Sequence, residues 1–458
     1  MAEWRGVPNE ALKQAMGHGG QAGTIACLDA PRGLELGVDL KSFTIGDRFK
    51  GIKLLPPGLH FLHYQQAQDV SRGVFVQLGT AAGSSTAGAE AVGELDAAPR
   101  VAGFRWDPRE EDFGALGDED LARLTQAVLN LELDSHLGPF DTEHWGTWTA
   151  LTRCVDLEVL QRVGVPLNSV IIDAPQGKVS TSPMLQHNSQ VSYCAPTFTT
   201  LPNLVDLSRR TRQNPGGSER DSLAERMQQL PGMHFLVDDQ GHRLSPAKVT
   251  ELQMDPSNLV LKLIKVDYAG HQELFVGELQ LAFVIFLYLA SLPALEFWKQ
   301  AVHLVASCSA LRASHPELMR LVVQTVTSQF FLLPKDLFQD DLLQDNFLVE
   351  ALATLVDLAD LGPDSVLLGP LRDLRKVLRD RYGKGLLARL DSFNEETENA
   401  FTFSSIDKRE AEIDNSVHFQ EVTGALAEDD DEENHEPEQG QRGRESSSPA
   451  RMAWMLGP

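Results

Sequence analysis

The chain has 458 residues, 42% hydrophobic and 23% charged, which is long enough for two or three globular units. Its 65 acidic and 40 basic residues give a net charge of −25. This charge disfavours direct binding to nucleic acid and to anionic membrane surfaces, because both depend on an excess of lysine and arginine.

The charge is unevenly distributed. Residues 391–458 contain 18 acidic and 5 basic residues, so about half of the net charge belongs to the C-terminal tail. The four cysteines lie far apart in the sequence, which excludes a local zinc-binding or redox motif. Together with the lack of an apolar N-terminal segment, they predict reduced thiols in a protein of the cytoplasm and nucleus.

Residues 1–165 are predicted to form a β-rich, sandwich-like N-terminal domain with appended helices. Pro56, Pro57 and Gly58 predict a turn between two strands, and the small, polar run at 80–99 predicts a flexible insertion. Five short β-prone stretches alternate with glycine and proline in this part of the chain: 23–29, 49–55, 58–64, 73–78 and 101–106.

Two helices are predicted to follow the strands. Residues 118–136 place leucine and valine at helical spacing, and a second helix carries Trp145, Trp148 and Leu151. Residues 166–240 are predicted to be a partly disordered linker, because their most polar part cannot bury enough apolar surface to fold.

Residues 241–393 are predicted to form an all-α C-terminal domain. Leu295, Trp298 and Val302 lie on one face of a helix in this region. The most apolar run, 281–290, has ten residues where a membrane span needs about 20, so it predicts a buried helix. The predicted fold class is therefore α+β multidomain, ending in a disordered acidic tail at 394–458 with a like-charge block at 428–438.

None of the His-Glu-x-x-His, G-x-S-x-G and P-loop motifs is present, and neither a cofactor nor a metal ion is predicted. The glycine-containing stretch 17–22 precedes a strand, whereas a dinucleotide-binding loop follows one and opens a helix. His60 and His63 are three residues apart in a predicted strand and point to opposite faces, so they cannot share a metal ion and are expected to have separate structural hydrogen bonds.

Two segments are candidates for partner binding. The first is a basic helix within 371–389, which is either a solvated face or a dock for an acidic partner or for the chain's own tail; its candidate residues are Arg372, Arg375, Lys376 and Arg379. The second is the β-prone island 416–422 in the tail, which either adds a strand to the sheet edge of a partner, packs on its own body, or stays disordered. Its side chains alternate, with Val417, Phe419 and Glu421 on one face and His418, Gln420 and Val422 on the other.

Three stretches, read together, resemble the AAR2 (AAR-two) family of splicing factors. They are GVDLKSFTIGDRFKGIKLLPPGLHFLHY at 37–64, GELQLAFVIFLYLASLPALEFWK at 277–299, and QDNFL at 344–348. Weaker similarities are LGPF at 137–140 and PAKVTELQMD at 246–255. The stretches occur in the family's order and span most of the chain from residue 23 to residue 390.

The resemblance implies a β-rich N-terminal domain and a C-terminal domain similar to VHS-type superhelices. It also implies a monomeric, non-catalytic assembly chaperone of the U5 (U-five) small nuclear ribonucleoprotein, or snRNP. Such proteins bind the RNase H-like and Jab/MPN-like domains at the C-terminal end of Prp8 (Prp-eight), the spliceosomal scaffold, and prevent premature engagement of the helicase. In the family, a tail strand bridges the two scaffold domains, and 416–422 is the tail stretch suited to that role.

An alternative reading is a trafficking or signalling adaptor whose VHS-like bundle binds short acidic peptides. It predicts association with vesicle cargo tails instead of nuclear ribonucleoproteins. The two readings are distinguished by which proteins the chain binds.

Overall fold

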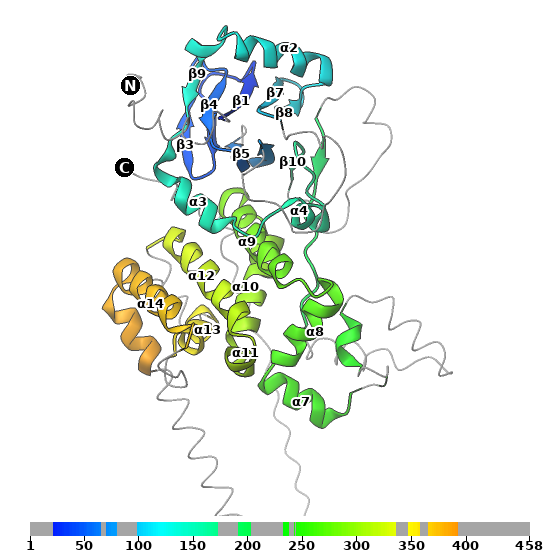
Figure 1. Ribbon diagram of the computed structural model, residues 1–458, viewed down its shortest axis with the longest axis vertical. Coiled ribbons are helices and arrows are strands. Elements are labelled where there is room, and N and C mark those ends of the chain that lie inside the picture. The colour runs from blue at the N-terminus through cyan, green and yellow to red at the C-terminus, as the bar shows by residue number, and fades with distance from the viewer. Residues whose placement is uncertain are drawn as a thin grey trace, which may run out of the picture.

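The computed structural model describes residues 22–65, 70–79, 99–172, 191–202, 232–237, 242, 244–335, 347–357 and 365–392. Within them, a two-sheet N-terminal domain lies over a helical C-terminal body (Figure 1). The predicted β-rich, sandwich-like domain and the predicted helical domain are both confirmed. The tail at 394–458, residues 80–98 of the predicted insertion 80–99, residues 17–21 of the glycine-containing stretch 17–22, and the island 416–422 lie outside the described residues.

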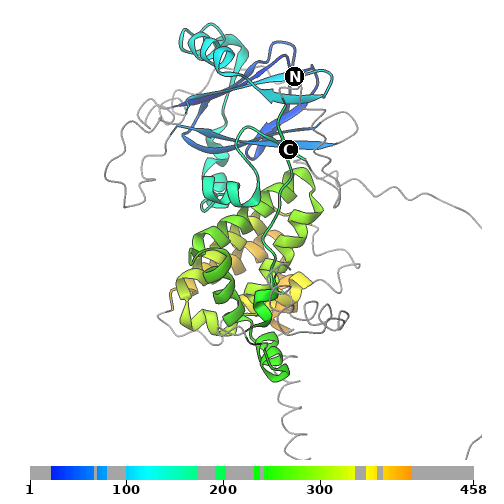
Figure 2. The same cartoon turned by 90° about the vertical axis from the view of Figure 1, so that its right-hand side faces the viewer.

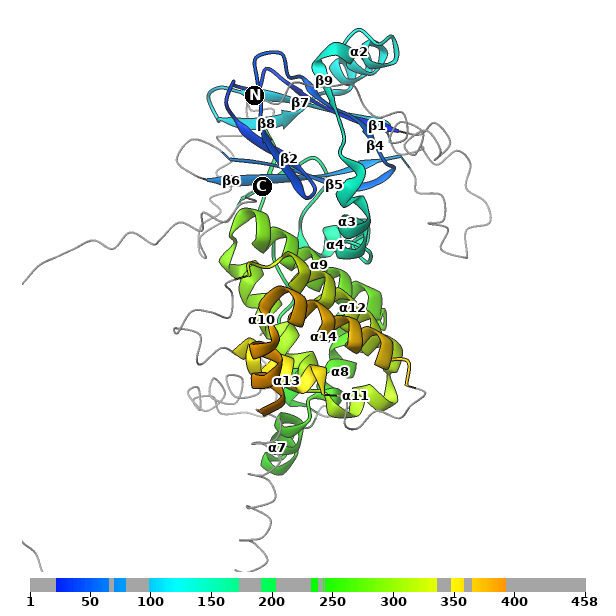
Figure 3. The ribbon, with the colours of Figure 1, turned by 90° about the vertical axis from the view of Figure 1, so that its left-hand side faces the viewer.

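The two sheets are stacked as layers, as Figures 2 and 3 show from two sides. The first sheet has the order β8 (Asp112–Ala115), β7 (Val101–Asp107), β1 (Gly23–Leu28), β4 (Gly51–Leu55) and β9 (Leu137–Pro139). The second has the order β11 (Tyr193–Cys194), β10 (Val170–Ile171), β6 (Ser71–Leu78), β5 (Gly58–Gln65), β2 (Glu35–Val38) and β3 (Lys41–Thr44). β10 and β11 lie inside the stretch 166–240, which was predicted from the sequence to be a linker. They form strands because Val170 pairs with Val74 of β6 and with Tyr193 of β11.

Side-chain alternation along β5 and β6 separates two cores. Leu62 and Val74 face the first sheet, whereas Phe61 and Phe75 face the helical body and lie in its core. This arrangement follows from the period of two residues in a strand. The second sheet is therefore buried on both faces and connects the two domains.

Helices complete the N-terminal domain. The helix α2 (Asp118–Leu129) covers the outer face of the first sheet through Leu124. The predicted helix 118–136 ends earlier than expected, and the short 3₁₀ turns η1 (Asp134–His136) and η2 (Thr142–His144) follow. The predicted tryptophan helix is α3 (Trp145–Leu151), whose Trp148 Nε1 donates to the carbonyl oxygen of Leu59, 2.8 Å away. Next comes α4 (Leu157–Val163), which packs against the helical body.

The helical body is built around α9 (Gln272–Leu289), which lies against β6. Among the described residues it is the one helix whose length and composition would suit a membrane span, but 78% of that window is buried inside the protein. The predicted buried helix at 281–290 is therefore confirmed. Among the described residues, the body also includes η3 (Met233–Leu236), α7 (Pro246–Met254), α8 (Ser257–Asp267), α10 (Leu292–Ala306), α11 (Ser309–Ser314), α12 (Pro316–Leu332), α13 (Phe347–Val356) and α14 (Leu368–Tyr382).

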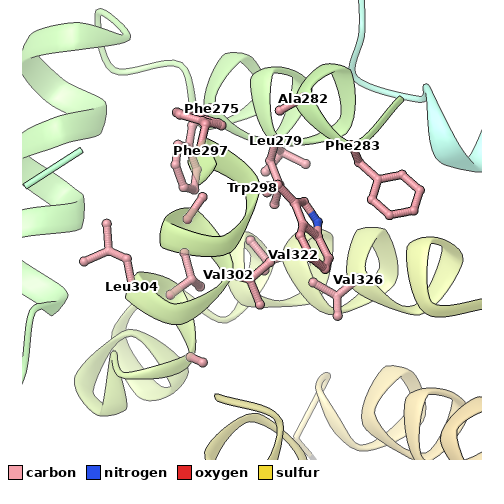
Figure 4. Packing of buried hydrophobic residues seen from close by; sticks show 14 of the residues in the cluster. Phe275, Leu279, Ala282, Phe283, Phe297, Trp298, Val302, Leu304, Val322 and Val326 are labelled. Carbon is pink, nitrogen blue, oxygen red and sulfur yellow. The ribbon is translucent and has the colours of Figure 1, made fainter. Parts of the chain in front are cut away.

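Trp298 of α10 fills the centre of this body. Figure 4 shows its ring between α9 and α12, beside Phe283, Val322 and Val326. Its indole nitrogen donates to the side-chain oxygen of Gln329 at 2.8 Å, so the one polar atom of the ring is satisfied inside the core.

Candidate functional site

A buried ion pair holds the first family-like stretch together. The carboxylate of Asp39, in the turn between β2 and β3, accepts from the backbone nitrogen of Phe61 at 2.9 Å and from Nδ1 of His60 at 2.8 Å. The other ring nitrogen of His60 lies 2.7 Å from the carbonyl oxygen of Pro56. The imidazole therefore connects the β2–β3 turn to the predicted proline turn between β4 and β5.

Both ring nitrogens of His60 face acceptors, an arrangement that favours the doubly protonated imidazolium form of the ring. Burial is the largest influence on its pKa and lowers it. The charge and hydrogen bond of Asp39, with the Pro56 carbonyl, outweigh burial and raise the pKa of His60 above its ordinary value. The ring also stacks on Trp145 of α3, with 5.2 Å between the ring centroids.

His63 lies on the opposite face of β5, as the sequence predicts. Its Nε2 donates to the backbone carbonyl of Asp39 at 3.2 Å, and its ring packs on Tyr288 of α9 with 4.3 Å between the centroids. Gly37 makes room for this ring, because a Cβ at that position would overlap it. Burial lowers the pKa of His63 to about 4, and the hydrogen bond to Asp39 offsets only part of that change.

These two histidines predict opposite pH dependences in separate windows. His63 is neutral in the folded protein, so its protonation in the unfolded chain lowers stability by roughly 3 kcal/mol as the pH falls from about 6.5 to about 4. The His60 contribution is complete below pH 6.5 and is lost as the pH rises through its raised folded pKa. Urea unfolding of wild type and His63→Phe between pH 4 and pH 7 tests this, because the variant is expected to lose the acid-side slope. An unchanged slope would contradict the assignment.

The second family-like stretch begins with a polar clamp between the domains. Glu278 of α9 accepts from the backbone nitrogen of Thr199 at 2.5 Å and from its hydroxyl at 2.9 Å, and also from the hydroxyl of Tyr268 at 2.9 Å. Burial raises the pKa of Glu278. These donors and the charge of Arg162 lower the pKa by a smaller amount, so that it stays above its ordinary value. The carboxylate thus fastens the extended segment 191–202 to the helical body.

Two neighbours of Glu278 hold the chain that precedes α4. The side-chain oxygen of Gln280 accepts from the backbone nitrogen of Cys154 at 2.8 Å, and its nitrogen donates to Thr325 of α12 at 3.0 Å. Gly277 lies so close to the Cys154 carbonyl that a Cβ would overlap its oxygen. We call Gly277, Glu278 and Gln280 the interdomain clamp. The side chains of Glu278 and Gln280 bind main-chain groups of the N-terminal part from a helix of the C-terminal body, and Gly277 lets the two chains approach closely.

The third family-like stretch is described only at its end. Leu348 is buried in the helical core, and residues 344–346 lie outside the described residues. In the described part of the chain, no group of three or more histidine, cysteine, aspartate or glutamate residues is placed to hold a metal ion.

The four predicted partner-binding residues of the basic helix lie on α14, with unequal surroundings. Arg372, Lys376 and Arg379 are exposed. Arg375 is partly buried, with hydrogen bonds to the carboxylate of Asp391 at 3.0 and 3.2 Å. The structure therefore brings three of the four residues together on one outer face and turns Arg375 toward its own chain.

Three residues of these sites were not predicted from the sequence: Asp39, Glu278 and Gln280. Glu278 and Gln280 lie in an otherwise apolar helix, and this signal could have identified them, because buried polar side chains require partners. Asp39 carried no comparable signal, since a turn aspartate is common at the surface.

Together these features define a two-domain protein in which a β-sandwich and a helical body share one core and are fixed by polar side chains. The AAR2 N-terminal domain model matches residues 21–166, and the AAR2 C-terminal repeat region model matches residues 237–404. Similar proteins include the "Protein AAR2 homolog" of Pongo abelii, 27% identical over 334 residues, and that of Homo sapiens, 27% identical over 336 residues. Each alignment covers 72% of this chain and 81% of the relative.

A more distant animal relative gives the same result. The "Protein AAR2 homolog" of Caenorhabditis elegans is 24% identical over 349 residues, covering 72% of this chain and 84% of the relative. The chain belongs to the AAR2 family. This membership supports a role related to splicing.

Proposed function

We propose that this chain is a non-catalytic assembly chaperone in U5 snRNP biogenesis and pre-mRNA splicing. It binds the C-terminal RNase H-like and Jab/MPN-like domains of the Prp8 scaffold and delays engagement of the helicase. It acts in the cytoplasm and the nucleus, and is a monomer apart from its partner. The observation that carries the proposal is the match of both AAR2 family models, in order, to the two halves of this chain.

The fixed arrangement of the domains supports a binding role. The interdomain clamp joins the sandwich and the helical body, so the chain presents one preformed surface and loses little conformational freedom on binding. The net charge of −25 also suits a protein that handles an RNA-binding scaffold without binding RNA itself.

The tail supplies the second part of the proposed mechanism. Once the body is docked, the segment 416–422 is held close to the scaffold, and its effective concentration is raised to the order of millimolar. An added strand then contributes main-chain hydrogen bonds at a sheet edge, with specificity from alternate side chains. Release of this one strand would weaken the whole complex.

A binding assay with two truncations tests the proposal. The full chain is expected to co-elute with a purified fragment containing both scaffold domains. A chain ending at Asn415 is expected to bind this fragment at least about 10-fold more weakly, because it lacks the bridging strand. A chain ending at Gly424 keeps the strand and lacks the acidic block, and it serves as the matched control with affinity no weaker than that of wild type.

The outcomes separate the two parts of the proposal. Equal affinity of the two truncated chains would remove the strand-addition mechanism. No binding by the full chain would remove the proposed function altogether.

A further inference from the structure

The outer face of α14 carries a narrow basic stripe, which we define as Arg372, Lys376 and Arg379. At 100° per residue, these positions fall within an arc of about 60°. All three residues are exposed, whereas Leu371, Leu374 and Leu378 on the opposite face are buried. The stripe is therefore held by a well-packed helix and points away from the helical body.

The other charges of α14 lie beside the stripe or are used within the fold. Asp373 and Asp380 fall on one flank, and only Asp380 contacts a stripe residue, at 3.1 Å from Nε of Arg379. Arg381 donates to the carbonyl oxygen of Leu333 at 2.7 Å and lies over the ring of Phe331. Among the described residues, no ion pair or hydrogen bond of Arg372 or Lys376 is present.

The chain leaves the described body next to this stripe. Asp391 forms a two-oxygen contact with Arg375, which flanks the stripe on the side away from Asp373 and Asp380. An acidic residue that follows the helix thus already binds α14. After Asp391 the sequence continues for 36 residues before the acidic block 428–438, in which eight of eleven residues are aspartate or glutamate.

Reach and spacing both allow the block to return to the stripe. A random-coil chain of 36 residues has a root-mean-square span of about 30–36 Å, and α14, with 15 residues, is about 22 Å long. Successive stripe residues are about 4.5–6 Å apart along the helix axis. Alternate residues of an extended chain are about 6.6 Å apart, so neighbouring carboxylates can pair with two or three cations together.

We propose that the acidic block 428–438 of this chain docks on the basic stripe of α14. The block is the most concentrated negative charge in the sequence and is tethered to the helix it would bind. It occupies the stripe in the free protein, and any anionic partner of this face must displace it. The inference does not depend on the scaffold partner proposed above, since it concerns the chain alone.

Zero-length cross-linking of the full chain tests the docking. A carbodiimide joins a lysine amine directly to a carboxylate, and the product is read by mass spectrometry of the monomer fraction. At low salt, Lys376 is expected to be joined to carboxylates of the 428–438 block. In the double variant Arg372→Glu and Arg379→Glu, which keeps the reactive lysine, the yield is expected to fall at least about fivefold. Arg123→Glu on α2, also at an exposed arginine, is the matched control and is expected to leave the yield unchanged.

Two results would overturn the proposal. The first is that no cross-link between Lys376 and the block forms at low salt, or that the cross-linking yield is equal in wild type and the double variant.

The second result comes from a binding assay, which tests whether nucleic acid can occupy the stripe. Its probe is a 20-nucleotide oligouridylate. A chain whose block carries Asn and Gln in place of Asp and Glu is expected to bind this probe more tightly than wild type does. Equal binding would mean that the stripe is open in the full chain.

Discussion

Asp39→Ala is expected to lower the free energy of unfolding by about 3–5 kcal/mol at pH 6. The substitution removes the carboxylate that pairs with the His60 imidazolium and leaves that cation buried without a counter-charge. It also removes the acceptor of the Phe61 backbone nitrogen. Urea unfolding, followed by tryptophan fluorescence, measures the change.

Asp39→Asn is the matched variant for this prediction. An asparagine keeps an acceptor for the Phe61 nitrogen and offers an N–H to a neutral His60, whose other nitrogen still donates to Pro56. Its cost is expected to be only about 1 kcal/mol, and the decline in stability on the alkaline side is expected to disappear. Equal losses in the two variants would show that the charge of the pair does not matter.

Glu278→Ala is expected to produce the second large loss, again about 3–5 kcal/mol. The partly buried amide of Thr199 and the buried hydroxyl of Tyr268 would lose their acceptor, and a cavity would remain beside α9. The segment 191–202 would then separate from the helical body before the rest of the fold opens. Hydrogen exchange at the Thr199 amide is expected to accelerate by at least about 100-fold, alongside the loss measured in urea.

Two controls make the clamp prediction specific. Glu278→Gln keeps the acceptor for Thr199 without a buried charge and is expected to lie within about 1 kcal/mol of wild type at pH 7. Glu296→Ala removes an exposed glutamate of α10 that accepts a hydrogen bond from Gln300, and it is expected to change stability by less than about 0.5 kcal/mol. A small effect of Glu278→Ala, similar to that of Glu296→Ala, would contradict the clamp.

The main strands could be predicted from the sequence because each is a β-prone stretch that has glycine or proline next to one of its ends. β5 and β6 begin within two residues of the predicted positions. The strands β2, β3, β8 and β9 have three or four residues each, and β10 and β11 have two. Segments this short carry almost no periodicity, and their pairing with distant strands determines their structure.

The residues of the site were harder to predict from the sequence than the fold was, and the reason is physical. The clamp joins Glu278 to Thr199 and Gln280 to Cys154, which are 79 and 126 residues apart in sequence. No local pattern specifies such pairs. The basic helix was visible as a run of charge, but the separation of Arg375 from the stripe depends on the position of Asp391 in the folded chain.

Binding of one large scaffold, without catalysis, is the role that we propose for this protein. Affinity purification of the tagged full chain from extracts of its own cells, followed by mass spectrometry of the bound proteins, tests it most directly. We expect stoichiometric recovery of the Prp8 scaffold with U5 proteins and without its helicase. Recovery of vesicle cargo or coat proteins, with the scaffold absent, would contradict it.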